Sequence, residues 1–461
     1  MVTILIAAFL ASAAFEPIGL WFLAIFGFAL FFRKLSSSNN PVVHSLIFGF
    51  TLNAVVLHWS GKYVGALPWL LLAVLQALFY LPIGLIYRRT KSLWLSAAML
   101  LFMEELRARF PFGGFGWTRI AFSQVESPAL PIVSIGGVLA LSAFTVLIAV
   151  LVTRIGLKSL VGITILFITA LLIPNNAQGS GSVRLLAVQG NTPEVGLEFN
   201  SRAKAVFNLH RDATREFAKE PYDAIIWPEN AIDVDPFANT KVSDSIESLT
   251  STLKIPLIAG AITRQGGQLE NVSLMYNESG EVVSYYSKQY LTPFGEYMPL
   301  RPIARLISPY VDDVVDFKVG ERVENHIVDG LDLAPVICYE LLSDLLVQNA
   351  AKTSNFLVVQ TNSATFSGTS ESAQQLNITR LRALENAREI VSISTIGISA
   401  HIGINGEVLS RTSENVSAQL SGDLHSNSIR TMANLLGGFA PVFILLTSIL
   451  FPLLVRIVRS R

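Results

Sequence analysis

Residues 334–340 have the sequence Ala-Pro-Val-Ile-Cys-Tyr-Glu, which places the only cysteine of the chain, Cys338, directly after a short apolar run. The run predicts a buried strand, and the residues beyond Glu340 predict a helix. At such a junction a side chain projects from the sheet edge, where the helix N-terminus favours a thiolate and an oxyanion. The stretch therefore indicates an α/β domain with a reactive thiol, although a lone free cysteine is more often a core residue.

Two other strand ends supply partners for this thiol, which needs a base or a cationic neighbour to become a nucleophile. Glu229 and Lys288 each follow an apolar, strand-like run. Taken singly, Glu229 is equally an acid near a helix N-terminus, and Lys288 a solvated lysine. His326 and His401, the nearest histidines, are more simply explained as strand or loop residues. A carboxylate, an ammonium and a thiol at three strand ends together predict a reactive site.

The region around these residues has the texture of a folded α/β domain. From Val183 onward charged residues become frequent and apolar runs shorten to strand length. Such runs predict strands over 183–188, 224–227, 256–261, 273–276, 282–286, 334–338, 356–360 and 391–394. Asn277 to Gly280 predicts a hairpin turn. Apolar residues three and four apart predict helices over 201–219, 243–253 and 374–388. We expect one layered α/β domain over 179–430.

The rest of the chain is far more apolar. The whole sequence is 51% hydrophobic and only 15% charged, with a mean hydropathy of +0.50, which argues against a purely soluble enzyme. Candidate membrane spans cover 2–15, 20–32, 42–58, 67–87, 93–103, 130–152, 160–173 and 432–457. They predict a membrane domain of about seven helices over 1–178 and a C-terminal transmembrane helix within 431–461.

Basic residues indicate how these spans are oriented. They fall in alternate loops, at Arg33-Lys34, Arg88-Arg89 with Lys91, Arg154 with Lys158, and Arg456, Arg459 and Arg461. The positive-inside rule then predicts two cytoplasmic termini and an extracytoplasmic α/β domain. The alternative of a signal peptide over 2–15 lacks the basic segment that such peptides carry.

Charge and composition also exclude several classes of function. Lys plus Arg equals Asp plus Glu at 34 each, so the chain has no net positive charge to attract nucleic acid. Nucleic-acid binding is therefore not predicted. One cysteine and six scattered histidines predict no disulfide, no metal site and no cofactor. A transporter or receptor is a further alternative, but the spans carry few charges. Glu104, Glu105 and Arg107 at one span end are expected to form a packing cluster, with a lipid headgroup as a possible contact.

Three local motifs carry a resemblance to a known family: Trp-Pro-Glu at 227–229, Lys288 ahead of Pro-Phe-Gly-Glu-Tyr-Met-Pro at 293–299, and Ile-Cys-Tyr-Glu at 337–340. They resemble the nitrilase superfamily, whose Glu-Lys-Cys triad lies on an αββα sandwich. With membrane spans on both sides, the chain looks like a member of the apolipoprotein N-acyltransferase family. Further matching segments are 15–19, 105–107, 116–117, 188–191, 374–376 and 380–385. The pattern departs at Phe199 and Thr365, where the family usually has tryptophan.

The resemblance implies transfer of a fatty acyl chain from a membrane phospholipid to the N-terminal amine of a diacylglyceryl-cysteine apolipoprotein. It implies that Glu229 is the general base and that Cys338 forms a thioester. Lys288 and the Tyr339 N–H group are expected to stabilise the oxyanion.

Supporting roles follow from the same resemblance. Glu296 is expected to hold the Lys288 ammonium, and Glu340 to support the thiol or the incoming amine. Apolar loops at 299–310 and 364–366 are expected to flank an opening toward lipid in a bacterial inner membrane. The alternative is a membrane-tethered amidase in which water resolves the acyl-enzyme.

Overall fold

The computed structural model describes residues 1–154, 156–175, 177, 179–196, 203–307, 309–321 and 324–459, with side chains as far as Leu450. The chain divides into two compact units, one of Met1–Asn175 with Thr431–Arg461 and one of Asn176–Arg430. Phe199 and Arg461, which the sequence singles out, lie outside the described residues.

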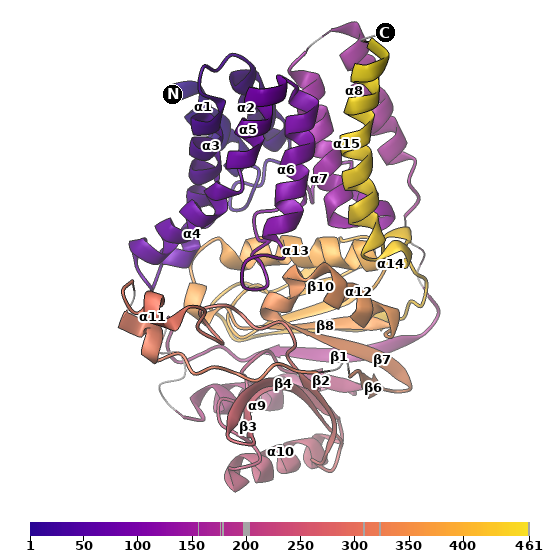
Figure 1. Ribbon diagram of the computed structural model, residues 1–461. Helices are drawn as coiled ribbons and strands as arrows, with labels where there is room; N and C mark the ends of the chain where they lie inside the picture. The colour runs from indigo at the N-terminus through magenta and orange to yellow at the C-terminus, as the bar shows by residue number, and fades with distance from the viewer. Residues whose placement is uncertain are drawn as a thin grey trace. The chain divides into compact units, whose positions relative to one another are not determined.

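The unit Asn176–Arg430 is built on two sheets (Figure 1). The first contains β1 (Ser182–Gln189), β2 (Ala224–Ile226), β3 (Leu257–Gln265), β4 (Gln268–Tyr276), β5 (Val282–Ser287) and β12 (Ala418–His425). The second contains β6 (His326–Val328), β7 (Leu331–Ile337), β8 (Phe356–Thr361), β9 (Ile390–Ser394), β10 (Ala400–Ile402) and β11 (Val408–Arg411). Their strand orders, within the described residues, are β12-β1-β2-β3-β4-β5 and β11-β10-β9-β8-β7-β6.

Parallel strands form the middle of each sheet. β1, β2 and β3 are parallel in the first sheet, and β7, β8 and β9 in the second. The flanking pairs, such as β4 with β5, are antiparallel. Since the carboxyl ends of neighbouring parallel strands share one edge of a sheet, residues following β2, β7, β8 and β9 are placed for ligand binding.

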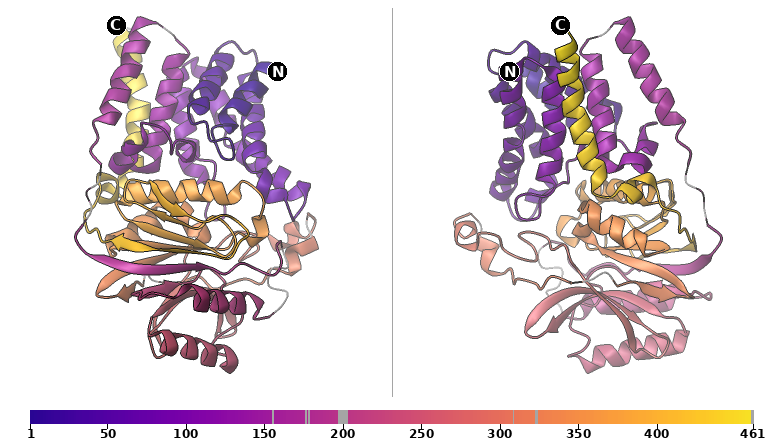
Figure 2. Two further views of the ribbon diagram at one scale, coloured as in Figure 1. Left: turned by 180° about the vertical axis from the view of Figure 1, so that it is seen from behind. Right: turned by 45° about the vertical axis from the view of Figure 1, so that its right-hand side comes forward.

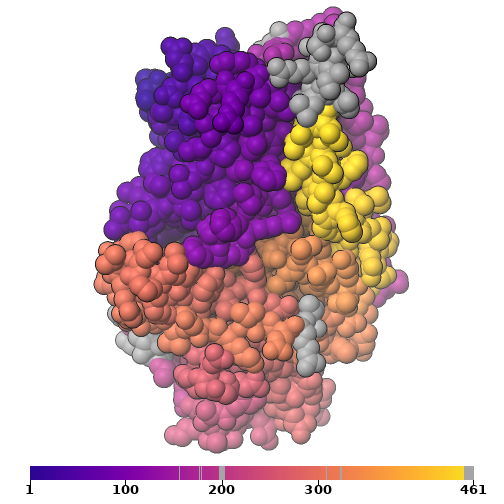
Figure 3. Space-filling view, in the orientation of Figure 1, coloured from indigo at the N-terminus to yellow at the C-terminus, as the bar shows by residue number. Residues whose placement is uncertain are grey.

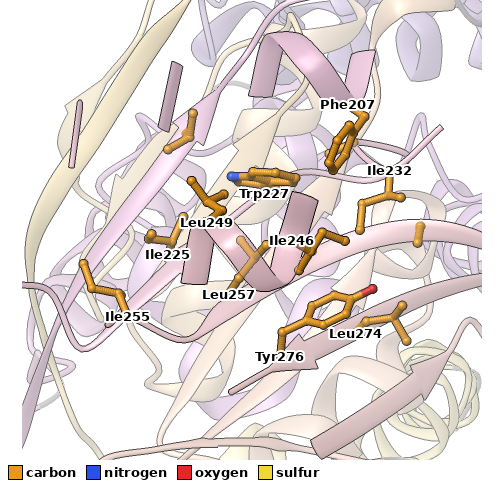
Figure 4. Packing of buried hydrophobic residues seen from close by; sticks show 14 of the residues in the cluster. Phe207, Ile225, Trp227, Ile232, Ile246, Leu249, Ile255, Leu257, Leu274 and Tyr276 are labelled. Carbon is orange, nitrogen blue, oxygen red and sulfur yellow. The ribbon is translucent and has the colours of Figure 1, made fainter. Parts of the chain in front are cut away.

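Helices cover the outer face of each sheet (Figure 2). α9 (Ala205–Phe217) and α10 (Thr240–Leu253) pack on the first sheet around Trp227, as Figure 4 shows. α12 (Asp344–Lys352) and α13 (Glu371–Asn386) pack on the second. The inner faces of the two sheets form a separate core with Ile226, Ile258 and Val358. The layers are α, β, β and α, and the predicted layered α/β domain is confirmed.

The alternation along β1 explains why the central strands are apolar throughout. Leu186 and Val188 face the helices, whereas Leu185 and Ala187 face the second sheet. Side chains alternate along a strand, so a strand buried on both faces needs apolar residues at every position. The edge strands β6, β11 and β12 are partly exposed and lack this pattern, and the sequence prediction misses them. It also misses β10, which is buried but only three residues long.

The unit Met1–Asn175 with Thr431–Arg461 is helical. Its α-helices are α1 (Val2–Ser12), α2 (Phe22–Ser36), α3 (Pro41–Val56), α4 (Ala66–Leu78), α5 (Leu81–Thr90), α6 (Leu93–Arg107), α7 (Val133–Val152), α8 (Leu157–Leu171), α14 (Met432–Leu436) and α15 (Phe439–Arg459). The span predicted over 67–87 is thus two helices, with Pro82 in the first turn of the second. The span predicted over 432–457 is also divided, because Gly437 takes a non-helical conformation.

Two helical runs in this unit, Ala66–Thr90 and Leu130–Val152, are long and apolar enough to cross a membrane by length and composition. Other apolar helices are shorter, and a multi-pass arrangement stays a prediction. α15 packs on α6 and α7 of its own unit, and Figure 3 shows its yellow outer side exposed. Phe443 and Leu446 on that helix are 69% and 52% exposed.

Close packing and buried charge hold this unit together. A Cβ atom on Gly27 of α2 would lie 2.5 Å from the backbone nitrogen of Ala11 in α1. The absence of a side chain at Gly27 therefore lets α1 and α2 pack closely. The predicted packing cluster at the end of α6 is buried. Arg107 donates to Gln76 at 3.1 Å, and Glu105 pairs with Arg119 at 2.9 Å.

Candidate active site

Glu229 lies just beyond the carboxyl end of β2. The Trp227 N–H group donates to the Ile258 carbonyl at 2.8 Å and extends the pairing with β3 by one residue. A Cβ atom on Gly260 would come within 2.6 Å of Glu229 Cα, so glycine lets the chain turn over β3. From the second sheet, Gln360 donates to the Trp227 carbonyl at 2.7 Å and Thr395 to the Glu229 carbonyl at 3.1 Å. Both sheets therefore hold the backbone that presents this carboxylate.

Lys288, directly after β5, lies within the same buried cluster. Its side chain is 1% exposed, and its ammonium lies 3.3 Å from Glu229 Oε1 and 2.9 Å from Glu296 Oε1. Its backbone N–H group donates to the Asn271 carbonyl at 2.9 Å. The Asn271 side chain donates to both carboxylates, at 2.8 Å to Glu229 and 2.6 Å to Glu296. One ammonium and one amide therefore join two carboxylates.

Burial and these charges give each group a distinct protonation behaviour. Burial would lower the pKa of Lys288, but Glu296, Glu229 and Cys338 raise it above its ordinary value. Burial opposes ionisation of Glu296, yet the Lys288 ammonium holds its pKa below the ordinary value. Burial raises the pKa of Glu229, and the Glu296 charge adds to the rise against the pull of Lys288. Of the two carboxylates, Glu229 is therefore the one suited to accept a proton.

Cys338 begins a tight turn that leads from β7 toward α12. It has φ +49°, a left-handed conformation that non-glycine residues rarely adopt. The Glu340 carboxylate closes the turn by accepting the Ile337 N–H group at 2.7 Å. A 3₁₀ turn, Cys338–Leu342, comes first, and the helix predicted beyond Glu340 follows as α12, which begins at Asp344. Cys338 as a whole is half-buried, and the residues on either side of it are buried.

Glu340 also ties this turn to the segment that follows Lys288. Its Oε1 atom accepts the N–H groups of Gln289 at 2.7 Å and Tyr290 at 3.2 Å, and the Tyr286 hydroxyl donates to both of its oxygens. Tyr339 stacks on Tyr290 with ring centroids 5.4 Å apart. The Glu340 carboxylate is fully buried and occupied by these donors, so it lies where it can fix the spacing of the thiol and the ammonium.

The protonation of Cys338 depends on the same cluster. Burial raises the pKa of the thiol well above its ordinary value, and the Glu229 charge adds to this, whereas Lys288 lowers it. The thiol is therefore the resting form and needs a base before it can attack. The Gln375 side-chain amide, from α13, lies 3.9 Å from the sulfur. The structure brings Glu229, Lys288 and Cys338 into one cluster.

Sequence reasoning missed two members of this cluster. Asn271 lies in β4, which begins at Gln268, whereas the predicted strand begins at Ser273 and does not include Asn271. Gln375 lies inside the predicted helix 374–388 but was given no role. A polar residue within a strand that is buried along most of its length could have identified Asn271, because a buried amide needs partners.

The two apolar loops differ. In 299–310 the side chains of Leu300, Ile303 and Leu306 are 57%, 55% and 86% exposed, and Figure 3 shows this salmon-coloured segment at the surface. In 364–366, by contrast, Ala364 is buried and Thr365 is half-buried.

Among the residues that the structure describes, no group of three or more His, Cys, Asp or Glu side chains could hold a metal ion.

A Glu340→Gln substitution tests the connection between the two segments. Whichever way the amide turns, its NH₂ group faces a backbone N–H donor, and at least one of the N–H groups of Ile337, Gln289 and Tyr290 loses its acceptor. We expect a fall of about 1–3 kcal/mol in the free energy of unfolding, measured by denaturant titration. The control is Glu216→Gln on the exposed face of α9, which should change stability little. Equal stability of the two variants would contradict this role of Glu340.

Comparisons with known proteins extend over both units. A family model described as the apolipoprotein N-acyltransferase N-terminal domain matches residues 7–151, and one described as carbon-nitrogen hydrolase matches 185–434. An apolipoprotein N-acyltransferase of Mycolicibacterium smegmatis is 30% identical over 87% of this chain and 75% of its own length. Relatives of that name from Azotobacter vinelandii and Coxiella burnetii are 28% and 29% identical, over 91% and 77% of this chain and 88% and 76% of their own lengths.

Proposed function

The chain belongs to the apolipoprotein N-acyltransferase family, and we propose that it performs lipoprotein N-acylation through a thioester on Cys338. The observation that carries this mechanism is the buried cluster in which Lys288 lies between Glu229 and Glu296 and acts electrostatically on the Cys338 thiol. The acyl donor is a membrane phospholipid, and the acceptor is the N-terminal amine of a diacylglyceryl-cysteine apolipoprotein.

The first half-reaction forms the acyl-enzyme. Glu229 takes the proton of the Cys338 thiol, and the sulfur attacks the ester carbonyl of the phospholipid. Lys288 and the Tyr339 N–H group stabilise the oxyanion, and one such donor contributes about 3 kcal/mol. Glu229 then returns the proton to the leaving alcohol, and a lysophospholipid departs. Glu296 and Asn271 hold Lys288 and Glu229 in position. Glu340 connects the segment that follows Lys288 to the turn at Cys338.

The second half-reaction transfers the acyl chain. The amine attacks the thioester carbonyl, and the thiol is regenerated. Only an uncharged amine is a nucleophile, and an α-amino group has a pKa of about 8, so activity should rise from acidic pH toward that value.

Both substrates carry acyl tails, which explains why the chain has an apolar unit as well as an α/β domain. We assign 1–178 and 431–461 to the bacterial inner membrane as a multi-pass domain and a C-terminal transmembrane helix, and 179–430 to its extracytoplasmic face, with both termini cytoplasmic. The basic loops support this orientation. The exposed apolar side chains of Leu300, Ile303 and Leu306 support contact of the 299–310 loop with lipid.

Intact mass spectrometry of the full-length protein tests this proposal. After incubation with a phospholipid of defined acyl chains in detergent micelles, we expect a mass increase of one acyl group on Cys338, which a diacylglyceryl-cysteine peptide then removes. A membrane-tethered amidase would acquire no acyl group from phospholipid and would hydrolyse a small amide instead. An unmodified protein under these conditions would contradict the proposal.

A further inference from the structure

Glu371 is a buried carboxyl group to which the mechanism above assigns no role. It is the first residue of α13 and only 3% exposed, and its Oε2 atom has no hydrogen-bond partner among the described residues. A buried polar atom without a partner costs free energy, so such an atom at a reactive site indicates a missing ligand. The hydroxyl of Ser363, which follows β8, is buried beside this carboxyl group and opposes the rise of its pKa.

The helix directs this carboxyl group toward the thiol. Residues four positions apart lie on one face of a helix, and Gln375, four positions after Glu371, reaches the Cys338 sulfur at 3.9 Å. Glu371 also interacts electrostatically with Cys338 and with Glu229. The titratable groups around it are therefore Cys338, Glu229 and the half-buried Glu414.

We propose that Glu371 receives the ammonium group of the acceptor and takes its first proton, so that a neutral amine meets the thioester on Cys338. The inference rests on the proposed function and deepens it, because it names the part of the site that recognises the second substrate. An ammonium group would supply the donor that Oε2 lacks and the positive charge that three neighbouring acids, Glu371, Glu229 and Glu414, favour.

The proton balance of the second half-reaction requires such a group. The acceptor arrives with three protons on nitrogen and leaves with one. The first proton moves to the Glu371 carboxylate, and the nitrogen lone pair forms the C–N bond. The second proton moves to the Glu229 carboxylate. The C–S bond then breaks with its electron pair on sulfur, Glu229 protonates the thiolate of Cys338, and Glu371 releases its proton to solvent.

The other carboxylates of the site are unsuited to this task. The pKa of Glu296 is held below its ordinary value beside Lys288, so Glu296 is a weak base. Both oxygens of Glu340 are occupied by the Tyr286 hydroxyl and by backbone N–H groups. Burial raises the pKa of Glu371 to about 8, which matches the α-amino pKa of about 8 and makes proton transfer between the two nearly balanced.

A Glu371→Gln variant of the full-length protein separates the two half-reactions. Glutamine resembles the protonated carboxyl group, so we expect normal folding and a rate of thioester formation within about twofold of wild type. Transfer from the isolated thioester to a diacylglyceryl-cysteine peptide should slow by about 100-fold, the lower end of the usual contribution of a proton-transfer group. Intact mass spectrometry follows both steps. Glu216→Gln, on the exposed face of α9 and away from the cluster, is the control and should transfer at close to the wild-type rate.

The pH dependence of transfer gives a second readout. In the wild-type protein the reactive state has one proton shared between the amine and Glu371. Below pH 8 both groups are protonated, and above pH 8 both are deprotonated. The rate should therefore peak near pH 8 and fall on either side. In Glu371→Gln only the free amine reacts, so the rate should rise through pH 8 and level off above it. The difference between the two proteins should therefore shrink by about pH 9.5, where the amine is largely uncharged.

Three results would overturn the inference. Undiminished transfer by Glu371→Gln, with normal thioester formation, would overturn it alone. Equal losses in both half-reactions would assign Glu371 to the thiol instead of the amine. A wild-type protein that acquires no acyl group from phospholipid would overturn the proposed function itself, which the same mass measurement detects before any variant is made.

Discussion

A Cys338→Ala protein is expected to take no acyl group from phospholipid and to lose activity by a factor on the order of 10⁴ or more, as enzymes do when the nucleophile is removed. The physical reason is that Cys338 supplies the only thiol of the chain, and no other nucleophile lies in the described cluster of Glu229, Lys288 and Glu296. The measurement is intact mass after incubation with a defined phospholipid, together with transfer to a lipopeptide.

The unfolding temperature of Cys338→Ala provides the control. Cys338 as a whole is half-buried, and its described hydrogen-bond contact is the long one of 3.9 Å from Gln375. Removing it should therefore leave stability near that of the wild type, so that lost activity cannot be attributed to unfolding. A fully active Cys338→Ala protein would exclude the thioester mechanism.

Glu229→Gln is expected to slow thioester formation by about 10²- to 10⁴-fold, the usual contribution of a general base. Glutamine keeps a carbonyl oxygen that can accept from Asn271 and Lys288, so the packing survives. What disappears is the ability to take the Cys338 proton, and burial keeps the pKa of that thiol high. Stopped reactions analysed by mass spectrometry give the rate of acylation, and thermal unfolding gives the stability.

The comparison of rate and stability decides the role of Glu229. A large loss of rate with a small loss of stability supports a general base. Parallel losses of both would assign Glu229 to holding Lys288 and Asn271 in place. Glu296→Gln is a useful companion, since Glu296 shares the same two partners but has a pKa held low beside Lys288. It should act on the position of Lys288 and less on deprotonation of the thiol.

The arrangement assigns most polar residues of the site to positioning and leaves few for chemistry. Glu340 joins the segment after Lys288 to the turn of Cys338, and Asn271 joins Glu229 to Glu296. Glu340 and Asn271 are both almost fully buried. Groups held in this way need little reorganisation when charge develops on the substrate, which is the main advantage of a preorganised site.

The sequence by itself determined the local features of this protein. Strand ends at Glu229, Lys288 and Cys338, the hairpin turn at Asn277–Gly280 and the layered α/β domain all follow from patterns within a few residues. These patterns are local because side chains alternate along a strand and recur every three to four residues along a helix. The edge strands and the exact helix limits escaped prediction, since exposed or interrupted segments lack such periodicity.

Only the tertiary structure decided which side chains meet. Lys288 and Glu229 are 59 positions apart, and Gln375 and Cys338 are 37 positions apart. Pairing of β2, β4 and β5 in one sheet, and packing of α13 on the other, brings them together. Asn271 and Glu371 appear ordinary in the sequence, one before a predicted strand and one before a predicted helix. Their importance comes from burial beside charged partners, which depends on contacts between distant segments and leaves no local pattern.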